Sequence, residues 1–357
     1  MIDLTPRSAE ADFARLSHYV PQSYLRRWSP GGNRVWSYRL LVPQTQSPVW
    51  KFRSIRGIGV RRDLYTSIAE GKESDEIERW LNRDVEDPAL PVLDRLCAEV
   101  TLSPVDRKKL ARYVASLYAR SPIYYDEHTR TAAEFLETQL KDPGELIARA
   151  AKKAASRGRT IDPGVEAKKR PSSLVVDALA PSEENSMPAL QVRAVVGREM
   201  WLESIRRIVD DVSPAFENHD WQIFRPYPGW VWYTSDHPLV RLNWVSPDEY
   251  DLKGGLGRTG GDLMLPLSPN HMLHTQIGQP KKHVDVLSLE KTLLLKRLIA
   301  ENAFRWVVAD LPRRNAEWFR PRFVNLQQYV DEETTWSKFH EDQSVAEREL
   351  RESPKRS

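Results

Sequence analysis

Two hydrophobic spacings divide the chain into helix-like and strand-like blocks. From residue 74 to residue 150, apolar side chains recur at the 3.6-residue spacing of amphipathic helices. Apolar and polar positions alternate with the period of two that strands show in residues 34–40, 49–60, 221–226, 230–234, 239–242 and 263–267. This combination predicts an α+β fold in which an antiparallel sheet packs against a largely helical block.

Capping and turn residues set the expected ends of several elements. Ser103 and Pro104 predict a helix start, because serine caps the first N–H groups and proline suits the first turn. Pro122 is expected to interrupt that helix.

Three further elements are expected in the second half of the chain. The strands 221–226 and 230–234 should form a hairpin, because a Pro-Gly pair lies between them. Long helices are expected over residues 188–212 and 289–306, where the apolar residues return to helical spacing.

The chain is expected to form one α+β domain over residues 1–310. Within it, residues 149–187 are rich first in Lys and Arg and then in Pro and Ser, which predicts a mobile basic connector after the helical block. Residues 311–357 are highly charged and weakly apolar. They predict a charged C-terminal extension that is either an exposed helix or a disordered tail.

Composition excludes several classes of protein. Cys97 is the only cysteine among 357 residues, so neither an intramolecular disulfide nor a multi-cysteine zinc site can form. The sequence has no run of about 18 apolar residues and no signal-peptide pattern at its start. We therefore expect a cytoplasmic protein that does not span a membrane. The net charge of +3 is too small to indicate a nucleic-acid partner by itself.

Twelve tryptophans are the least usual feature of the composition. Six of them lie in or beside predicted strands and three on predicted helices, and we expect them to fill the core between sheet and helices. The alternative is stacking on nucleic-acid bases, for which Trp50 beside Lys51, Arg53 and Arg56 is the best placed.

His18 is a candidate general base or metal ligand, and Arg120 is a candidate for binding an anion. His18 lies just before a helix that Pro21 starts, where an imidazole can act as a general base or a metal ligand. Arg120 lies at the broken end of an apolar helix, where a guanidinium can hold a phosphate with two hydrogen bonds. The alternatives are a partly buried histidine at the helix start and an arginine paired with a nearby glutamate.

Carboxylates form a second group of candidates. Glu78 and Glu86 lie eight residues apart, on one side of the expected helix, while Asp236 follows a strand and precedes His237. Carboxylates gathered in this way can hold a divalent cation. The alternatives are a solvated helix face that Arg79 shares, and an aspartate that closes a turn.

Four motifs in this order resemble the DUF4238 family. They are HYVPQSYLRRW at residues 18–28, RSP at 120–122, TSDHP at 234–238 and LPLSP at 265–269, and the resemblance covers roughly residues 17–310. The family is a bacterial domain of unknown function, so the resemblance implies a family and no mechanism. It more usually carries asparagine where His237 stands, which favours Asp236 over His237 as an essential group. It more usually carries phenylalanine where Ser23 and Trp28 stand.

Our first function hypothesis is a metal-dependent phosphodiester hydrolase, a nuclease of a prokaryotic defence or toxin system. Its catalytic residues would be His18, Glu78, Glu86, Arg120 and Asp236. Among these, the three carboxylates would hold Mg²⁺ or Mn²⁺, Arg120 would stabilise phosphate charge and His18 would act as base or ligand. Basic segments would steer the nucleic acid or nucleotide.

Two other classes of function remain open. The chain could be a non-catalytic module that recognises a nucleotide, a peptide or a partner protein through the His-x-Val-Pro-Gln element and an aromatic-lined pocket, with Gln22, Tyr24 and Arg27 as binding residues. It could also form a homo-oligomer. It could also be a glycohydrolase or transferase that uses NAD, with His, Tyr and Glu side chains around the nicotinamide ribose.

Overall fold

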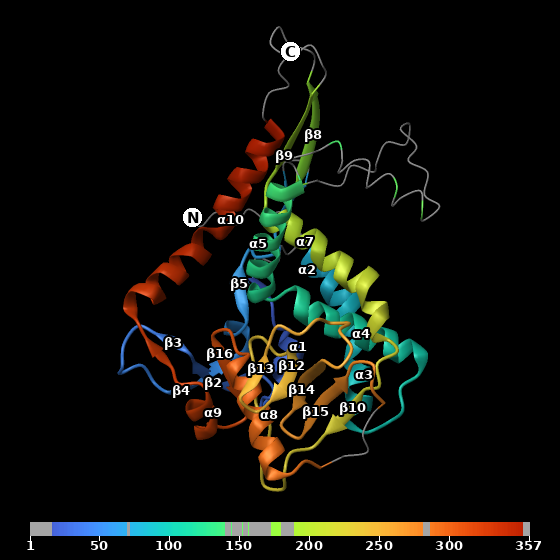
Figure 1. The fold of residues 1–357 in the computed structure, drawn as a ribbon. Helices are drawn as coiled ribbons and strands as arrows, with labels where there is room; N and C mark the ends of the chain where they lie inside the picture. Colours follow the sequence, from blue (N-terminus) through green and yellow to red (C-terminus); the bar gives the residue numbers. More distant parts are fainter. Residues whose placement is uncertain are drawn as a thin grey trace, which may run out of the picture.

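The chain folds as an α+β protein, with antiparallel sheets and a block of helices around them (Figure 1). This is the fold class that the hydrophobic spacings predict. The computed structural model describes residues 16–69, 72–139, 173–179, 189–280 and 286–352, together with positions 144, 152 and 156.

The larger sheet is built from the central part of the chain. Its strand order is β10-β15-β14-β12-β13, and neighbouring strands are antiparallel. The strands are β10 (Gln222–Phe224), β12 (Val240–Ser246), β13 (Glu249–Asp251), β14 (Asp262–Ser268) and β15 (His271–Gln276). Side chains two residues apart share a face, so alternate residues of each strand line the face toward α8 (Leu289–Glu301).

A second sheet joins strands that are far apart in the sequence. Its order is β11-β16-β2-β4, from β11 (Thr234–Ser235), β16 (Trp306–Ala309), β2 (Arg34–Arg39) and β4 (Trp50–Ser54). Four smaller pairs complete the described strands: β1 (Leu16–His18) with β5 (Val60–Arg62), β3 (Leu41–Val42) with β17 (Phe323–Val324), β6 (Ser67–Ala69) with β7 (Lys72–Ser74), and β8 (Leu174–Leu179) with β9 (Ala189–Ala194).

Helices of the first half pack into one block. The block contains α2 (Glu76–Leu81), the π-helix η2 (Asn82–Glu86), α3 (Asp87–Cys97), α4 (Pro104–Ala119) and α5 (Pro122–Gln139). The predicted start of α4 is confirmed, because the Ser103 hydroxyl accepts from the Asp106 N–H and the Asp106 carboxylate accepts from the Ser103 N–H. The break at Pro122 is also confirmed, since α5 begins there.

The remaining helices include a short one after β1 and several in the second half. They are α1 (Gln22–Arg26), the 3₁₀ turns η1 (Ile55–Gly57) and η4 (Ser213–Phe216), α7 (Arg198–Arg207), the π-helix η3 (Ile208–Val212), α9 (Arg314–Phe319) and α10 (Leu326–Glu352). None of the helices in the described part of the chain is both long enough and apolar enough to cross a membrane.

The charged C-terminal extension forms a helix through residue 352 rather than a disordered tail. Figure 1 shows α10, in red, running along one flank of the molecule up to the β8–β9 hairpin. Near its start, Glu332 pairs with Arg61 and Arg305. Near its end, the fully buried Glu347 pairs with Arg198 at 2.7 Å. Ion pairs thus hold the helix to the rest of the protein at both ends.

The predicted hairpin over residues 221–234 is wrong. Residues 222–224 pair with β15 and residues 234–235 pair with β16, so the two segments belong to different sheets. The intervening prolines cannot donate backbone hydrogen bonds to a ladder, and Trp232 instead donates its N–H to the Pro269 carbonyl.

The two long helices of the second half are shorter than predicted. Residues 189–194 form β9, and α7 begins only at Arg198, whose N–H is capped by the Gln343 side chain of α10. Likewise α8 ends at Glu301, and Trp306 begins β16. In both places contacts with distant parts of the chain set where the helix begins or ends. The local spacing of apolar residues does not reveal such contacts.

Much of the predicted basic connector lies outside the described residues. Of residues 149–187, the structure describes positions 152, 156 and 173 and the strand β8, which pairs with β9 as an antiparallel hairpin. Residues 140–150 of the predicted helical block lie outside the described residues as well, except for position 144.

Several tryptophans fill the core, as expected. Trp28, Trp201 and Trp232 are fully buried. The candidate for base stacking, Trp50, is partly buried against Tyr38 and donates its indole N–H to Glu317 at 2.7 Å.

Gly59 fixes the segment that carries His18. Its carbonyl accepts from the N–H groups of Tyr19 and Val20, and its φ of +62° lies in the left-handed region. A Cβ at Gly59 would lie 2.7 Å from Cβ of Val20, which is closer than real Cβ contacts. Only glycine therefore fits this position without a shift of the backbone.

Gly59→Ala is expected to lower the free energy of unfolding by about 2 to 4 kcal/mol, through backbone strain and overpacking. Urea titration followed by circular dichroism measures this change. Gly31→Ala is the control, because nothing lies within 4 Å of its added Cβ. Equal stabilities of the two variants would contradict the role given to Gly59.

Candidate functional site

Four of the predicted residues converge in one buried polar cluster, formed by His18, Glu78, Glu86 and Arg120. β1 supplies the histidine, α2 and η2 supply the glutamates, and the arginine follows the last residue of α4. Electrostatic interactions link His18 to both Glu86 and Arg120, and Glu78 to the same two residues. Each of the four side chains is at most 9% exposed.

A π-turn places Glu86 in the cluster. The N–H of Asp87 donates to the Asn82 carbonyl, five residues earlier, and the turn is followed by Pro88, which has no N–H to continue an α-helical ladder. Single π-turns inside α-helices are rare and are frequent at functional sites. The extra residue changes the angle at which Glu86 leaves the helix, and its side chain is buried.

Glu86 connects three elements. It accepts a hydrogen bond from Nη1 of Arg120 at 2.6 Å and a longer one from the Ser23 hydroxyl of α1 at 3.4 Å. The Arg120 carbonyl in turn accepts from the Tyr65 hydroxyl at 3.1 Å. Neighbouring Glu86 raises the pKa of Arg120 although burial opposes this rise, so the guanidinium is charged.

Arg120 leaves two of its nitrogens without partners. It is 1% exposed, and neither Nε nor Nη2 has a hydrogen-bond acceptor. Another fully buried arginine, Arg198, differs in this respect, because Glu347, Ser344 and His340 contact all three of its nitrogens. Unpaired buried donors are costly, so the free side of Arg120 is suited to an anion that supplies the missing acceptors.

His18 presents an unpaired nitrogen in the same cluster. Its imidazole bonds to the Arg56 backbone carbonyl, and because Nε2 has no partner this bond is made by Nδ1. Burial lowers the pKa of His18, so the neutral ring is favoured. A neutral imidazole with its proton on Nδ1 carries a free lone pair on Nε2, which can accept a proton.

Glu78 is the carboxyl whose protonation changes near neutral pH. Burial raises its pKa to about 7, with Glu86 adding to the rise while Arg120 opposes it. Its Oε2 atom has no partner, whereas the backbone N–H of His18 donates to the carboxylate. A carboxyl with this pKa can donate a proton at neutral pH and below.

Asp236 is used elsewhere in the fold. Its carboxylate accepts from the N–H groups of Phe304 and Arg305, and from the Tyr19 hydroxyl at 3.3 Å. Burial raises the pKa of Asp236 to about 6, while these N–H groups oppose the rise. The contacts stabilise the turn between α8 and β16, so the Asp236 carboxylate closes a turn that is distant in the sequence and not the local turn before Pro238.

His237 contacts the same turn from the segment after β11. Its Nδ1 lies 3.2 Å from the Asn302 carbonyl, and the Asn302 amide donates to the backbone carbonyls of His237 and Leu239. Burial lowers the pKa of His237 to about 4, so the ring is neutral.

The expected metal site of Glu78, Glu86 and Asp236 is not assembled. In the part of the chain that the structure describes, no group of three or more His, Cys, Asp or Glu side chains is placed to hold a metal ion. The physical reason is that backbone N–H groups already engage the Asp236 carboxylate, while Arg120 neutralises Glu86.

The expected binding residues attach α1 to the larger sheet. The buried Tyr24 hydroxyl donates to the Pro266 carbonyl and lies 2.6 Å from the Thr234 hydroxyl. Arg27 donates to the Leu267 carbonyl, to Asp94 and to Cys97. Gln22, in the first turn of α1, is partly buried. The polar atoms of Tyr24 and Arg27 thus form hydrogen bonds within the fold, including bonds to the backbone of β14.

Two residues of the cluster were missed from the sequence. Tyr113 lies on the buried face of α4, and its hydroxyl has no partner. Ser23 lies within the N-terminal motif and contacts Glu86. A tyrosine on an otherwise apolar helix face was the one available signal, since a buried hydroxyl normally needs a partner.

Comparison with known proteins gives one match. A family model described as "Protein of unknown function (DUF4238)" matches residues 17–312. No curated protein and no solved structure matches the chain. The match includes every residue of the buried cluster and stops before α10.

The raised pKa of Glu78 predicts a pH dependence of stability. Between its ordinary value of 4.5 and about 7, the carboxyl is protonated in the folded protein and ionised in the unfolded chain. Unfolding then releases a proton, so the free energy of unfolding falls as pH rises through this window, by about 3 kcal/mol from this group.

Glu78→Gln should remove that contribution. Urea titrations of both proteins at pH 4.5, 6 and 7.5 are compared, and the wild type should lose more stability than the variant. Asp236 also titrates in this range but is present in both proteins, so it cancels in the difference. Parallel profiles would show that Glu78 ionises normally.

Proposed function

We propose that the chain, which belongs to the DUF4238 family, hydrolyses a small phosphodiester in its buried cluster. One observation carries the proposal: the buried, charged Arg120 has two unpaired nitrogens and lies next to an unpaired imidazole nitrogen and a carboxyl with a pKa of about 7. An anion binding group and a proton donor and acceptor are the parts that such a hydrolysis needs.

The roles follow from the protonation states. Arg120 would bind the phosphate oxygens and stabilise the charge that develops on them. Nε2 of neutral His18 would take a proton from the attacking water, and protonated Glu78 would give its proton to the leaving oxygen. A proton passing from His18 to Glu78 then restores the starting state, so the cycle is balanced.

Burial favours a small substrate over a polymer. His18 and Glu78 are 9% and 8% exposed, so a nucleic-acid backbone held on the surface does not reach them. This supports a nucleotide-sized ester, in place of the long DNA or RNA that a defence nuclease would cut. The groups of the cluster supply acid and base chemistry themselves, which supports a reaction that needs no Mg²⁺ or Mn²⁺.

The test is hydrolysis of bis(p-nitrophenyl) phosphate and of 2′,3′-cyclic nucleotides in EDTA, with DNA, RNA and NAD as comparison substrates. Activity should fall as pH rises through about 7, because Glu78 then loses the proton it donates. Glu78→Gln should lower kcat by at least about 100-fold, the usual contribution of a general acid.

Arg120→Lys has a matched control. Arg120→Lys should raise KM and lower kcat, because lysine keeps the charge but loses the two-nitrogen contact. Arg198→Lys changes another fully buried arginine and should leave the specific activity of the folded protein unchanged. Hydrolysis only with added Mg²⁺, or no hydrolysis of any of these substrates, would refute the proposal. Saturable binding without turnover would favour the non-catalytic module instead.

A further inference from the structure

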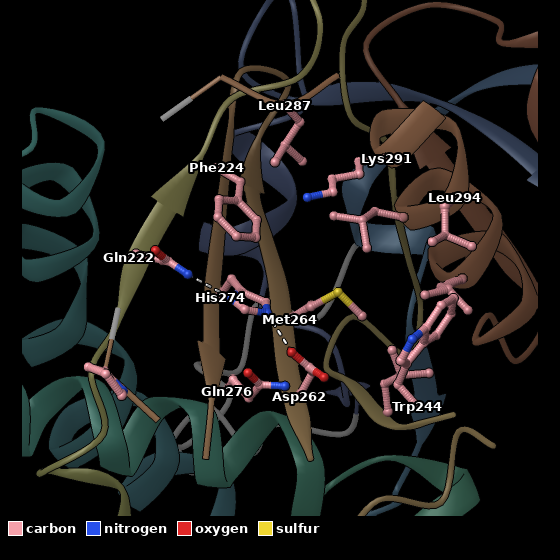
Figure 2. Close-up of a pocket in the computed structure, with 14 residues that line it drawn as sticks. Gln222, Phe224, Trp244, Asp262, Met264, His274, Gln276, Leu287, Lys291 and Leu294 are labelled. Carbon is pink, nitrogen blue, oxygen red and sulfur yellow. Dashed lines mark hydrogen bonds and ion pairs between the residues drawn. The ribbon is translucent and has the colours of Figure 1, made fainter. Parts of the chain in front are cut away.

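A pocket of about 280 Å³ lies between the larger sheet and α8 (Figure 2). It shares no residue with the buried cluster. Its floor is made by alternate residues of β10, β15, β14 and β12, and its roof by the leucines of α8. A mostly apolar cavity with a few polar groups at one end is the usual form of a small-molecule site.

The polar end of the pocket is a hydrogen-bonded row. Nε2 of Gln222 lies 3.0 Å from Nδ1 of His274, and Nε2 of His274 lies 2.8 Å from Oδ1 of Asp262. Because the amide nitrogen can only donate, Nδ1 accepts, and the ring proton on Nε2 is directed to Asp262. This arrangement fixes the neutral tautomer and leaves Oε1 of Gln222 buried without a partner.

A ligand group that donates hydrogen bonds therefore suits this end of the pocket. Gln222 has an unpaired carbonyl oxygen, and Asp262, on the other side of His274, has a carboxylate. Amide and carboxylate side chains that line a pocket are the groups that accept hydrogen bonds from the amino edges of nucleobases.

The middle of the pocket suits a flat apolar body. Phe224 stacks on His274, with ring centroids 4.5 Å apart, while Met264 and Leu294 line the cavity from the sheet and from α8. Trp244, stacked on Tyr250, contributes to the lining at its edge. A volume of about 280 Å³ lies at the small end of ligand pockets, so it suits a ligand no larger than a mononucleotide and is too small for a dinucleotide.

The opposite end of the pocket is positive. In Figure 2, Lys291 extends from α8 toward Phe224, on the side of the pocket away from Asp262. Lys291 is exposed and lies in the first turn of α8, where the helix dipole adds to its positive potential. An anionic group on the ligand would meet this end of the pocket.

We infer that this pocket binds a nucleoside monophosphate with an amino-bearing base. The amino edge of the base lies at the polar end, where Gln222 and Asp262 flank His274, the ring lies between the sheet and α8, and the phosphate lies near Lys291. The inference stands apart from the proposed function, because it uses other residues and needs no catalysis.

Calorimetric titration with AMP, CMP and UMP, and with adenosine and cytidine, tests the inference. AMP or CMP should bind at least fivefold more tightly than UMP, because uracil has no amino group. Gln222→Leu should weaken binding of the preferred nucleotide about tenfold, since its amino edge loses a buried acceptor.

Lys291→Gln tests the contribution of the positive end of the pocket separately from that of the polar end. It should weaken the monophosphate about two- to fivefold and leave the nucleoside unchanged, as expected for one partly exposed charge pair. Lys108→Gln, at an exposed lysine of α4, is the matched control and should change neither affinity.

Three results would overturn the inference. They are no binding of any nucleotide at millimolar concentration, equal affinity in the wild type and in Gln222→Leu, and binding of octanoate in preference to the nucleotides. If Arg120→Lys abolishes nucleotide binding while Gln222→Leu retains it, the nucleotide occupies the buried cluster instead. Failure of hydrolysis at that cluster would leave the result for the pocket unaffected.

Discussion

The ion pair between Arg120 and Glu86 is the interaction on which the candidate site depends. It joins the end of α4 to the π-turn before α3, and Ser23 extends the connection to α1. Removing one member of a buried pair usually costs about 3 to 5 kcal/mol, because the other charge is left without compensation. The pair therefore holds His18 and Glu78 in a fixed relation to Arg120, and the same charges set the pKa of Glu78.

Arg120 and Arg198 are both fully buried, yet they have different roles in the structure. Glu347, Ser344 and His340 of α10 occupy all three nitrogens of Arg198, so that this pair attaches the C-terminal helix to α7. The nitrogens of Arg120 are only partly occupied. A saturated arginine is sufficiently explained by the fold, whereas an unsaturated one with unpaired His18 and Glu78 atoms nearby points to a ligand. The family match contains Arg120 and Arg198 but ends before α10, so Arg198 finds its partners outside the matched region.

The motifs that identify the family have mainly structural roles in the described contacts. Tyr24 and Arg27 of the N-terminal motif bond to the backbone of β14, and Asp236 and His237 hold the turn after α8. These polar residues sit at junctions between elements, where backbone N–H and C=O groups need partners that no ladder supplies. Among the motif residues that keep an unpaired polar atom, which include Trp28 and His237, His18 and Arg120 are the two that lie in the buried cluster with Glu78.

The sequence by itself determined the fold class, the start of α4, the break at Pro122 and four residues of the cluster, because these follow from local spacing, capping and chemistry. Tertiary structure decided what is non-local: the sheet partner of residues 222–224, the starting point of α7 at the Gln343 cap, and the use of Asp236 in a turn. It also decided which groups stay unpaired and how far burial moves the pKa of Glu78. Both the unpaired groups and the pKa of Glu78 depend on which distant segments pack together and exclude water. A local pattern of residues does not show which segments these are.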